Sequence, residues 1–419
     1  MAPARTPAAG ARSEYVILAL IVLAVFGGLG LGRFGYTSLL PAMQAGLQLT
    51  NTQTGELQSW NLAGYLLTAV LAGLLAARFG PRLVIASALV VAALGMLLTG
   101  AVPTFGGARL GRFLAGVGGA GSNIPGMGLV SAWFGSRRRG LAAGAAVSGS
   151  SLGLIVTGPL IPLLLVRYGD DGWRVGWGAL GAMALGIGGL CAWLLRDRPD
   201  AQEPGANRPR DGRDAGGARG APSWAAVWRS LVLWHLAGIY LAFGFSYVVY
   251  ATFFIRYLVG EGGFTAAAAG FLWLLVGVVS VVSGFLWGGI SDRWGRRAAL
   301  VGVFLVQGTA FLIFGLTCAW PMLVLSAGLF AVTAWSVPAL IAASAGDMFG
   351  ARMAPAAIGL MTFVMSLGQV AGPYLAGRIA DATRSFGPAF LTAGCVALLL
   401  GAGGSFLLRP RILRGPSGV

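Results

Sequence analysis

Apolar segments long enough to cross a bilayer recur along the whole chain, separated by short breaks rich in Gly, Pro and Arg. A membrane-spanning helix needs about 20 apolar residues. Hydrophobic residues make up 57% of the 419 residues and charged residues 10%, whereas about a quarter of a soluble domain is charged. The chain therefore has too few charges to cover a water-facing surface, and we predict an all-α integral membrane protein.

The apolar segments number twelve, six on each side of one long polar stretch. They cover residues 15–43, 54–78, 83–102, 107–134, 140–167, 173–195, 228–259, 264–290, 298–318, 320–345, 355–381 and 385–408. The polar stretch 196–224 has the composition of a linker, so we expect residues 1–195 and 225–419 to form two six-helix halves. Residues 1–13 form a short polar tail, and the first apolar segment is too long for a cleaved signal peptide.

The distribution of arginine predicts the orientation. All 29 basic residues are arginines, against 13 acids. Such an excess in a soluble protein would indicate nucleic-acid binding, but most of these arginines lie between apolar segments, so we expect no nucleic-acid partner. If both termini are cytoplasmic, 21 arginines lie on the cytoplasmic side and 7 on the other, with Arg33 alone inside a span. The positive-inside rule therefore predicts cytoplasmic termini in a bacterial inner membrane.

The reactive residue types do not indicate an enzyme. Cys191, Cys318 and Cys395 lie within apolar segments and lack CxxC spacing, so neither a disulfide framework nor a zinc site is expected. The sequence contains no phosphate-binding loop, metal-ligand cluster or nucleophile–base pair. We therefore predict no catalytic activity, no cofactor and no metal.

The two halves contain an internal repeat. The segment GLLAARFGPR at 73–82 reappears as GGISDRWGRR at 288–297, an offset of 215, and the pair Gly158-Pro159 reappears as Gly372-Pro373, an offset of 214. Duplicated halves are typical of secondary transporters, in which the substrate binds at the repeat interface and the halves rock around it. The repeat therefore indicates alternating access.

Segment 288–297 resembles the signature loop of the major facilitator superfamily, and the resemblance covers nearly the whole chain. Its acid, Asp292, can cap or pair with a neighbouring helix end and so act as a conformational lock. Its arginines, expected at the cytoplasmic face, are Arg293, Arg296 and Arg297. A plain positive-inside anchor is the alternative. The first copy has Ala77 where Asp292 stands, so we expect its lock to lack an acid.

Residues 112–121, RFLAGVGGAG, resemble the superfamily's fourth-helix motif. No strand precedes these glycines, so we expect them to permit close helix packing rather than to bind a dinucleotide. The resemblance implies a role for Arg112 in proton coupling, and an arginine that extends to the membrane interface is the alternative.

Two further regions are similar to monocarboxylate and oxalate/formate transporters: residues 133–153 followed by Gly158-Pro159, and residues 347–360 followed by Gly372-Pro373. Gly-Pro pairs let a helix bend, so we expect Gly158, Pro159, Gly372 and Pro373 to take part in gating. The eighth and eleventh segments lack the buried basic residues that oxalate-type carriers use for dianions, so a dicarboxylate substrate is not expected.

The first and seventh segments resemble a bacterial branch, the YbfB/YjiJ-like transporters. The matching stretches are GLGRFGYTSLLPAMQ at 30–44 and GFSYVVYATFFIRYLV at 244–259. This resemblance implies the twelve-helix fold of the superfamily and adds little about the substrate.

Arg33 is the strongest candidate for a substrate contact. It lies about 27 Å along the first span, at 1.5 Å per residue, and therefore within the hydrocarbon region. An arginine there costs about 2.5–3.5 kcal/mol on insertion scales and usually faces a wet cavity on a substrate path. Its guanidinium could bind a carboxylate through two parallel hydrogen bonds. Pairing with backbone carbonyls is the structural alternative.

At an offset of 214, Arg33 corresponds to Tyr247 and Tyr36 to Tyr250. We expect these positions to approach one central cavity from opposite sides, where the tyrosines supply hydroxyl groups and an aromatic wall. Interfacial anchoring is the alternative for each tyrosine. Further candidates for substrate contact, which could instead join helices by hydrogen bonds, are Asn123, Asn61, Tyr65, Trp335 and Gln369.

Proton coupling has little support in the sequence. None of the 13 acids falls at mid-helix depth. The single histidine, His235, lies early in the seventh segment and is expected to be structural. A proton could instead travel with a weak-acid substrate beside Arg33.

Together these patterns predict a monomeric secondary transporter in the lipid bilayer that moves a small organic anion, a monocarboxylate, with a proton. Proton-linked efflux of drug-like or amphipathic compounds is the alternative favoured by a roomy aromatic cavity. A sensor built on a transporter fold, without turnover, is the non-transport alternative.

Overall fold

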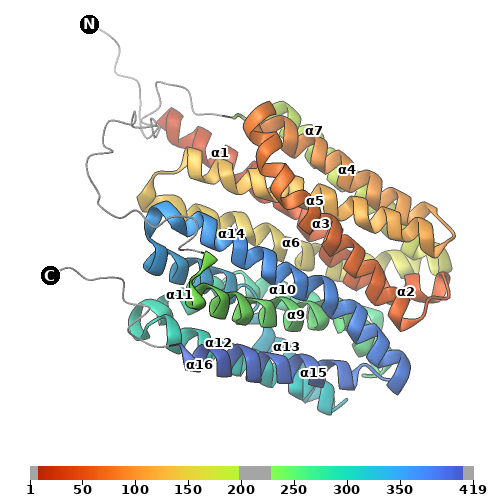
Figure 1. Ribbon diagram of the computed structural model, residues 1–419. Helices are drawn as coiled ribbons and strands as arrows, with labels where there is room; N and C mark the ends of the chain where they lie inside the picture. The colour runs from red at the N-terminus through yellow and green to blue at the C-terminus, as the bar shows by residue number, and fades with distance from the viewer. Residues whose placement is uncertain (1–7, 198–227, 409–419) are drawn as a thin grey trace, which may run out of the picture. The chain divides into compact units, whose positions relative to one another are not determined.

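The computed structural model describes residues 8–197 and 228–408, and its regular elements within these ranges are all helical (Figure 1). Most of the expected linker, 198–224, lies outside the described residues. The chain divides into two compact units. The first comprises Met1–Gly35, Ala63–Gly153 and Arg174–Gly217, and the second comprises Tyr36–Leu62, Leu154–Trp173 and Ala218–Val419.

The first unit is built from helices of the N-terminal part of the chain. They are α1 (Ala8–Val25), η1 (Phe26–Phe34), α4 (Pro81–Ala101), α5 (Phe105–Trp133), most of α7 (Gly172–Leu194), α3 (Asn51–Phe79) from Ala63 onward and α6 (Ser136–Tyr168) up to Gly153. α4 and α5 lie side by side along their lengths (Figure 1).

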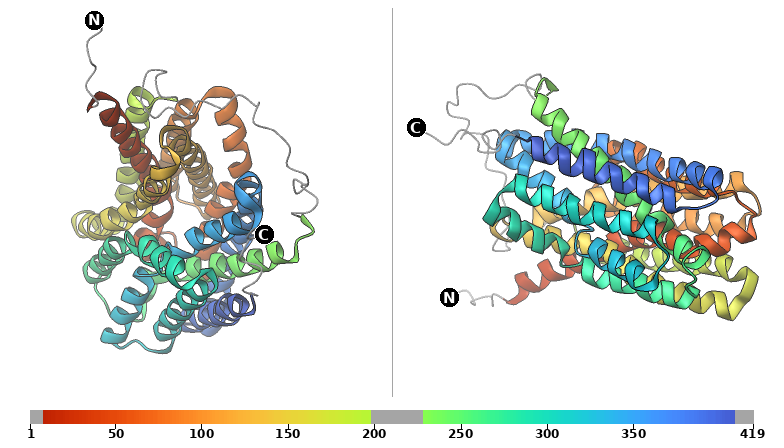
Figure 2. Two further views of the ribbon diagram at one scale, coloured as in Figure 1. Left: turned by 90° about the vertical axis from the view of Figure 1, so that its left-hand side faces the viewer. Right: turned by 90° about the horizontal axis from the view of Figure 1, so that it is seen from below.

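The second unit combines the remaining parts of those helices with the C-terminal ones. It contains α2 (Gly35–Gly46), the beginning of α3, the end of α6, η2 (Gly169–Asp171), α9 (Leu231–Gly260), α10 (Ala266–Ser280), α11 (Ser283–Trp294), α12 (Arg296–Leu316), α13 (Trp320–Ala331), α14 (Ser336–Thr383), α15 (Gly387–Val396), η3 (Ala397–Gly403) and α16 (Gly404–Leu407). α9 packs along α14 and α15 (Figures 1 and 2).

Ten segments among the described residues are long and apolar enough to cross a membrane. One of them, Arg138–Leu194, has 57 residues and contains both α6 and α7. α5 is a helix of 29 residues outside these ten segments; its many glycines and its two arginines make it less hydropathic than its neighbours. The all-helical membrane fold is confirmed, whereas the number of twelve spans stays a prediction.

Three expected boundaries are wrong. The first helix begins at Ala8, within the expected polar tail, since Ala and Arg are strong helix formers. The segment expected at 264–290 is divided between α10 and α11, with a break at Val281–Val282. The break expected at 346–354 is helical, because α14 continues through it, and the interruption lies at 332–335 instead. Residues 346–354 are polar enough to suggest a loop, but they include good helix formers.

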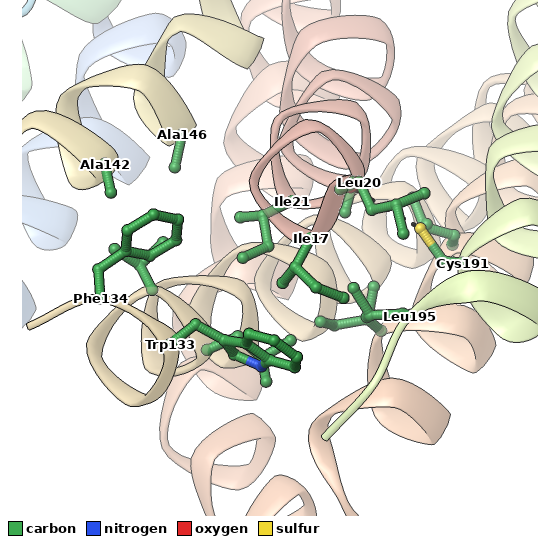
Figure 3. Packing of buried hydrophobic residues seen from close by; sticks show 14 residues of the cluster. Ile17, Leu20, Ile21, Trp133, Phe134, Ala142, Ala146, Cys191 and Leu195 are labelled. Atoms are coloured by element: carbon green, nitrogen blue, oxygen red, sulfur yellow. Dashed lines mark hydrogen bonds between the residues drawn. The ribbon is translucent and has the colours of Figure 1, made fainter. Parts of the chain in front are cut away.

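The core of the first unit is a cluster of apolar side chains from five helices (Figure 3). Trp133 at the end of α5 is 2% exposed and lies in this cluster with Ile17 and Leu20 of α1. Cys191 of α7 is fully buried there, with its sulfur 3.8 Å from the carbonyl oxygen of Leu20. Cys191 therefore behaves as a small apolar residue.

The internal repeat is visible in the backbone of two turns. Gly80, between α3 and α4, has φ +88°, and Gly295, between α11 and α12, has φ +89°. They are 215 residues apart, the offset found in the sequence. Residues with a β-carbon rarely adopt this conformation, so both copies of the loop motif need glycine for the same turn.

Candidate functional site

The first helix contains a π-helical segment, η1, that ends at the residues around Arg33. Four of its nine residues are glycines. A β-carbon added at Gly30 would lie 3.0 Å from the carbonyl oxygen of Gly149 and 3.0 Å from the α-carbon of Gly153. These glycines therefore let η1 approach α6 closely. π-helical turns are rare and occur frequently at functional sites.

Arg33 itself is 8% exposed, and its Nε and Nη2 atoms are buried without a hydrogen-bond partner among the described residues. The guanidinium carbon lies 4.8 Å from the centre of the Tyr65 ring. Asn123 of α5 donates a hydrogen bond of 2.9 Å to the hydroxyl of Tyr65. Arg33, Tyr65 and Asn123, from η1, α3 and α5, form what we call the Arg33 cluster.

The unpartnered atoms define what this cluster can bind. Nε and Nη2 lie on one edge of the guanidinium plane and point in nearly parallel directions, which suits the two oxygens of a carboxylate. Leaving buried charged donors unsatisfied is costly. The cluster is therefore suited to an anion that accepts both hydrogen bonds.

Arg112 supports the backbone next to Arg33. It is fully buried, its Nη1 donates a 2.5 Å hydrogen bond to the carbonyl oxygen of Gly32, and its guanidinium carbon lies 5.2 Å from the Trp177 ring centre. The alternative of an interfacial arginine is therefore wrong, since the side chain reaches inward to the first helix. Arg33 and Arg112 are the only buried charged side chains in the described part of the chain.

Three candidates in the second unit lie together. Gln369 of α14 donates a 2.6 Å hydrogen bond to the hydroxyl of Tyr247 on α9. The Tyr247 ring is stacked on Phe243, with 4.6 Å between ring centres, and meets Trp335 edge-on at 6.4 Å. Tyr247, Trp335 and Gln369 form the Tyr247 cluster. The offset of 214 suggested Tyr247, but no sequence pattern indicated its contact with Gln369.

The remaining candidates are held in structural contacts. Tyr36 is fully buried and donates a 2.7 Å hydrogen bond to the carbonyl oxygen of Thr54. Tyr250 is also fully buried among phenylalanine rings, with its hydroxyl 2.8 Å from that of Ser326. Interfacial anchoring is thus wrong for both tyrosines. Asn61 is 2% exposed and belongs to the second unit, whereas Tyr65 belongs to the first.

The predicted loop lock takes a specific form. Arg296 pairs with Asp292 at 2.7 Å and with Asp347 of α14 at 2.9 Å, so it joins the loop to a neighbouring helix. Arg297 lies over the ring of Phe406, 4.7 Å from its centre, and Arg293 is exposed. In the first copy Asp197 accepts a 2.6 Å hydrogen bond from the backbone N–H of Arg82. The copy with Ala77 therefore does have an acid, supplied from a distant position.

The Gly-Pro pairs lie at close helix contacts within the second unit. A β-carbon at Gly158 would collide with the carbonyl oxygen of Gly270 on α10, and one at Gly372 would lie 3.0 Å from that of Phe245 on α9. Pro159 and Pro373 follow directly inside α6 and α14. These helices could not approach so closely with larger residues.

One polar contact was not expected from the sequence. Asp381 of α14 accepts hydrogen bonds from the backbone N–H groups of Asn51, at 2.9 Å, and Thr52, at 2.8 Å, and from the Thr52 hydroxyl, at 2.5 Å. It therefore caps the first turn of α3. Its partners are about 330 residues away, so no local pattern could reveal the contact.

His235 has the structural role that was expected. Its Nε2 lies 2.8 Å from the carbonyl oxygen of Gly404, joining α9 to α16. The described residues contain no group of His, Cys, Asp or Glu suited to a metal ion.

Comparisons with known proteins agree with the fold. Residues 25–403 match the model of a family described as "Uncharacterised MFS-type transporter YbfB". The chain is 26% identical to the "Probable sulfoacetate transporter SauU" of Cupriavidus necator over 95% of this chain and 94% of that one. It is 26% identical to a hexuronate transporter of Bacillus subtilis over 96% of both chains. Among solved structures, a bacterial homologue of the human lysosomal transporter Spinster, inward-facing and unoccupied, aligns with TM-score 0.75 and 17% identity over 94% of this chain and 96% of that one.

Proposed function

The chain belongs to the family of YbfB-type transporters of the major facilitator superfamily, and on that premise we propose that it moves a small organic anion bound by Arg33. It is a multi-pass transporter of the bacterial inner membrane and not an enzyme. The observation that carries the proposal is the buried Arg33 guanidinium, whose Nε and Nη2 have no hydrogen-bond partner among the described residues.

The chemistry of the Arg33 cluster favours a monocarboxylate. A carboxylate on the Nε–Nη2 edge would neutralise one buried charge and satisfy both donors. Arg112, which lies next to this cluster, already donates to Gly32 and lies over Trp177. A second anionic group on the substrate would therefore meet, among the described residues here, no guanidinium as available as that of Arg33. The names of the two curated relatives both denote organic anions: hexuronate carries one carboxylate, whereas sulfoacetate carries a sulfonate as well, so these names support an organic anion and not the single charge.

The proposal also covers proton coupling, membrane topology and oligomeric state. Because no acid is buried among the described residues, a coupled proton would enter as part of a weak-acid substrate beside Arg33. We further propose twelve spans, cytoplasmic termini and a monomer that alternates between inward and outward access.

Uptake of radiolabelled monocarboxylates such as lactate, pyruvate and gluconate into proteoliposomes tests the proposal. Arg33→Gln keeps a polar side chain but removes the charge, and we expect uptake to fall at least about tenfold, since charged hydrogen bonds contribute about 1.5–3 kcal/mol each. Arg33→Lys keeps the charge without the two-pronged geometry and should retain an intermediate rate. Arg109→Gln is the matched control, because Arg109 lies over Phe105 near the beginning of α5.

Undiminished uptake by Arg33→Gln would refute the anion site while leaving the family assignment in place. Export of lipophilic cations with no anion flux would favour the drug-efflux alternative. Absence of flux for every substrate, with ligand-induced stabilisation, would favour the sensor.

A further inference from the structure

An apolar groove lies on the surface of the second unit, and none of its lining residues belongs to the Tyr247 cluster or to the segment 288–297. One wall is α9 from Trp234 to Leu241, the other is formed by η3 and α16 from Leu399 to Leu407, and the volume is about 640 Å³. A second hollow of about 470 Å³ runs from Leu391 to Leu400 and shares Leu399 and Leu400 with the first. The two hollows therefore adjoin along one exposed ridge.

Two of the glycines that line the groove are not explained by helix packing. A β-carbon added at Gly238 of α9 would meet no atom within 4 Å. One at Gly403, across the groove, would have its nearest neighbour at 3.6 Å. Glycine weakens a helix, yet no neighbouring helix requires it at these positions. The space above these two glycines is left open.

A cation lies at one end of the groove. The guanidinium of Arg297 is 4.7 Å from the ring centre of Phe406, which lines the groove. The adjacent Arg296 is paired with two carboxylates, whereas in the described part of the chain none lies within ion-pair distance of Arg297. The positive charge at the groove end is therefore not neutralised by these residues.

Two tryptophans indicate the depth of this end in the membrane. Trp234 lines the groove, and its indole N–H donates a 2.8 Å hydrogen bond to the carbonyl oxygen of Trp228. The two rings lie 6.0 Å apart near the beginning of α9. Tryptophan is enriched at the level of lipid headgroups, so we expect this end of the groove, where Arg297 lies over Phe406, at headgroup depth.

We infer that this groove binds one anionic phospholipid. The two adjoining hollows would take its acyl chains on either side of Leu399 and Leu400, and Arg297 would contact its phosphate. Basic positions beside apolar grooves bind anionic headgroups in membrane proteins. The unneutralised charge favours an anionic over a zwitterionic lipid. Lipid binding at this groove requires no particular transported substrate.

Native mass spectrometry of the delipidated full chain with equal amounts of dioleoyl phosphatidylglycerol and dioleoyl phosphatidylcholine tests it. We expect retention of phosphatidylglycerol over phosphatidylcholine. Arg297→Gln should lower that preference about fivefold, the effect of one basic residue near a membrane surface. Gly238→Leu should fill the groove and lower retention of both lipids.

Two variants serve as matched controls. Arg293→Gln removes the same charge from an exposed position at the end of α11, just before the turn that leads to Arg297, and Gly328→Leu adds a side chain where a β-carbon also meets no atom within 4 Å. Both should bind lipid as the unaltered chain does. Equal retention of the two lipids by the unaltered chain would overturn the choice of headgroup. Unchanged retention in Gly238→Leu would overturn the groove; if that variant does not elute as a single species, an unchanged preference in Arg297→Gln decides against the inference.

Discussion

Replacement of Asp381 by Ala should loosen the beginning of α3. The carboxylate accepts hydrogen bonds from two backbone N–H groups and one hydroxyl of Asn51 and Thr52. The first N–H groups of a helix have no partner within the helix, and a negative charge there is favourable. Loss of such a cap costs about 0.5–2 kcal/mol. Because Asp381 is exposed, we take about 1 kcal/mol, which corresponds to about a fivefold change in equilibrium.

Hydrogen–deuterium exchange of a peptide that covers the beginning of α3 measures this effect directly. Asp381→Ala should exchange the amides of Asn51 and Thr52 about fivefold faster. Asp381→Asn keeps one carbonyl oxygen as an acceptor and should give a smaller increase. Thr383→Ala is the control, because the Thr383 hydroxyl bonds only to backbone oxygens of its own region among the described residues. Unchanged exchange in Asp381→Ala would show that the cap does not hold α3 in solution.

Three further variants test contacts within the second unit. Gly158→Val places a side chain against the carbonyl oxygen of Gly270, so transport should be lost and the melting temperature, followed by intrinsic fluorescence, should fall. Tyr247→Phe leaves the amide of Gln369 without its 2.6 Å acceptor, and a buried unsatisfied donor costs about 1–3 kcal/mol, measured by thermal unfolding. Arg296→Gln removes both ion pairs of a side chain that is 22% exposed, and we expect a destabilisation of about 1 kcal/mol that high salt diminishes.

Each of these three variants has a control that alters the same kind of residue or the same contact. Gly106→Val alters a glycine whose β-carbon would meet nothing within 4 Å, and it should be tolerated. Tyr247→Phe combined with Gln369→Leu removes both partners of the hydrogen bond and should recover part of the lost stability. Arg293→Gln should leave stability unchanged. Equal effects of control and test variants would contradict the contact in question.

The fold class and most helix positions could be predicted from the sequence because the length of an apolar segment is set by the bilayer. The connection within α14 could not, since a polar composition at 346–354 does not distinguish a loop from a helical turn outside the membrane. Arg33 stood out because a charge at that depth is costly. The hydrogen bonds of Tyr36 with Thr54 and of Tyr250 with Ser326 could not be predicted. A tyrosine that bonds to a neighbouring helix has the same sequence context as one that contacts a substrate.

Contacts between distant residues were beyond sequence patterns. Asp381 at the beginning of α3 and Asp197 at the loop after α3 are brought there by the tertiary fold. The π-helical form of η1 was not predicted either, although its glycines were visible. Glycines in a membrane helix predict close helix packing, but they do not predict a π-helical turn.

The widened turn of η1 has a consequence for comparing this chain with its relatives. Each residue of an α-helix turns the chain by about 100°, and a π-helical turn holds more residues than an α-helical one. Deleting one residue between Phe26 and Phe34 would let this segment wind as a regular α-helix, and the helix before and after it would keep its facing, because the wide turn is what accommodates the extra residue. A gapless alignment with a relative that lacks the bulge would pair Arg33 with a residue on another side of the helix, so equivalence here follows from direction in space and not from column number.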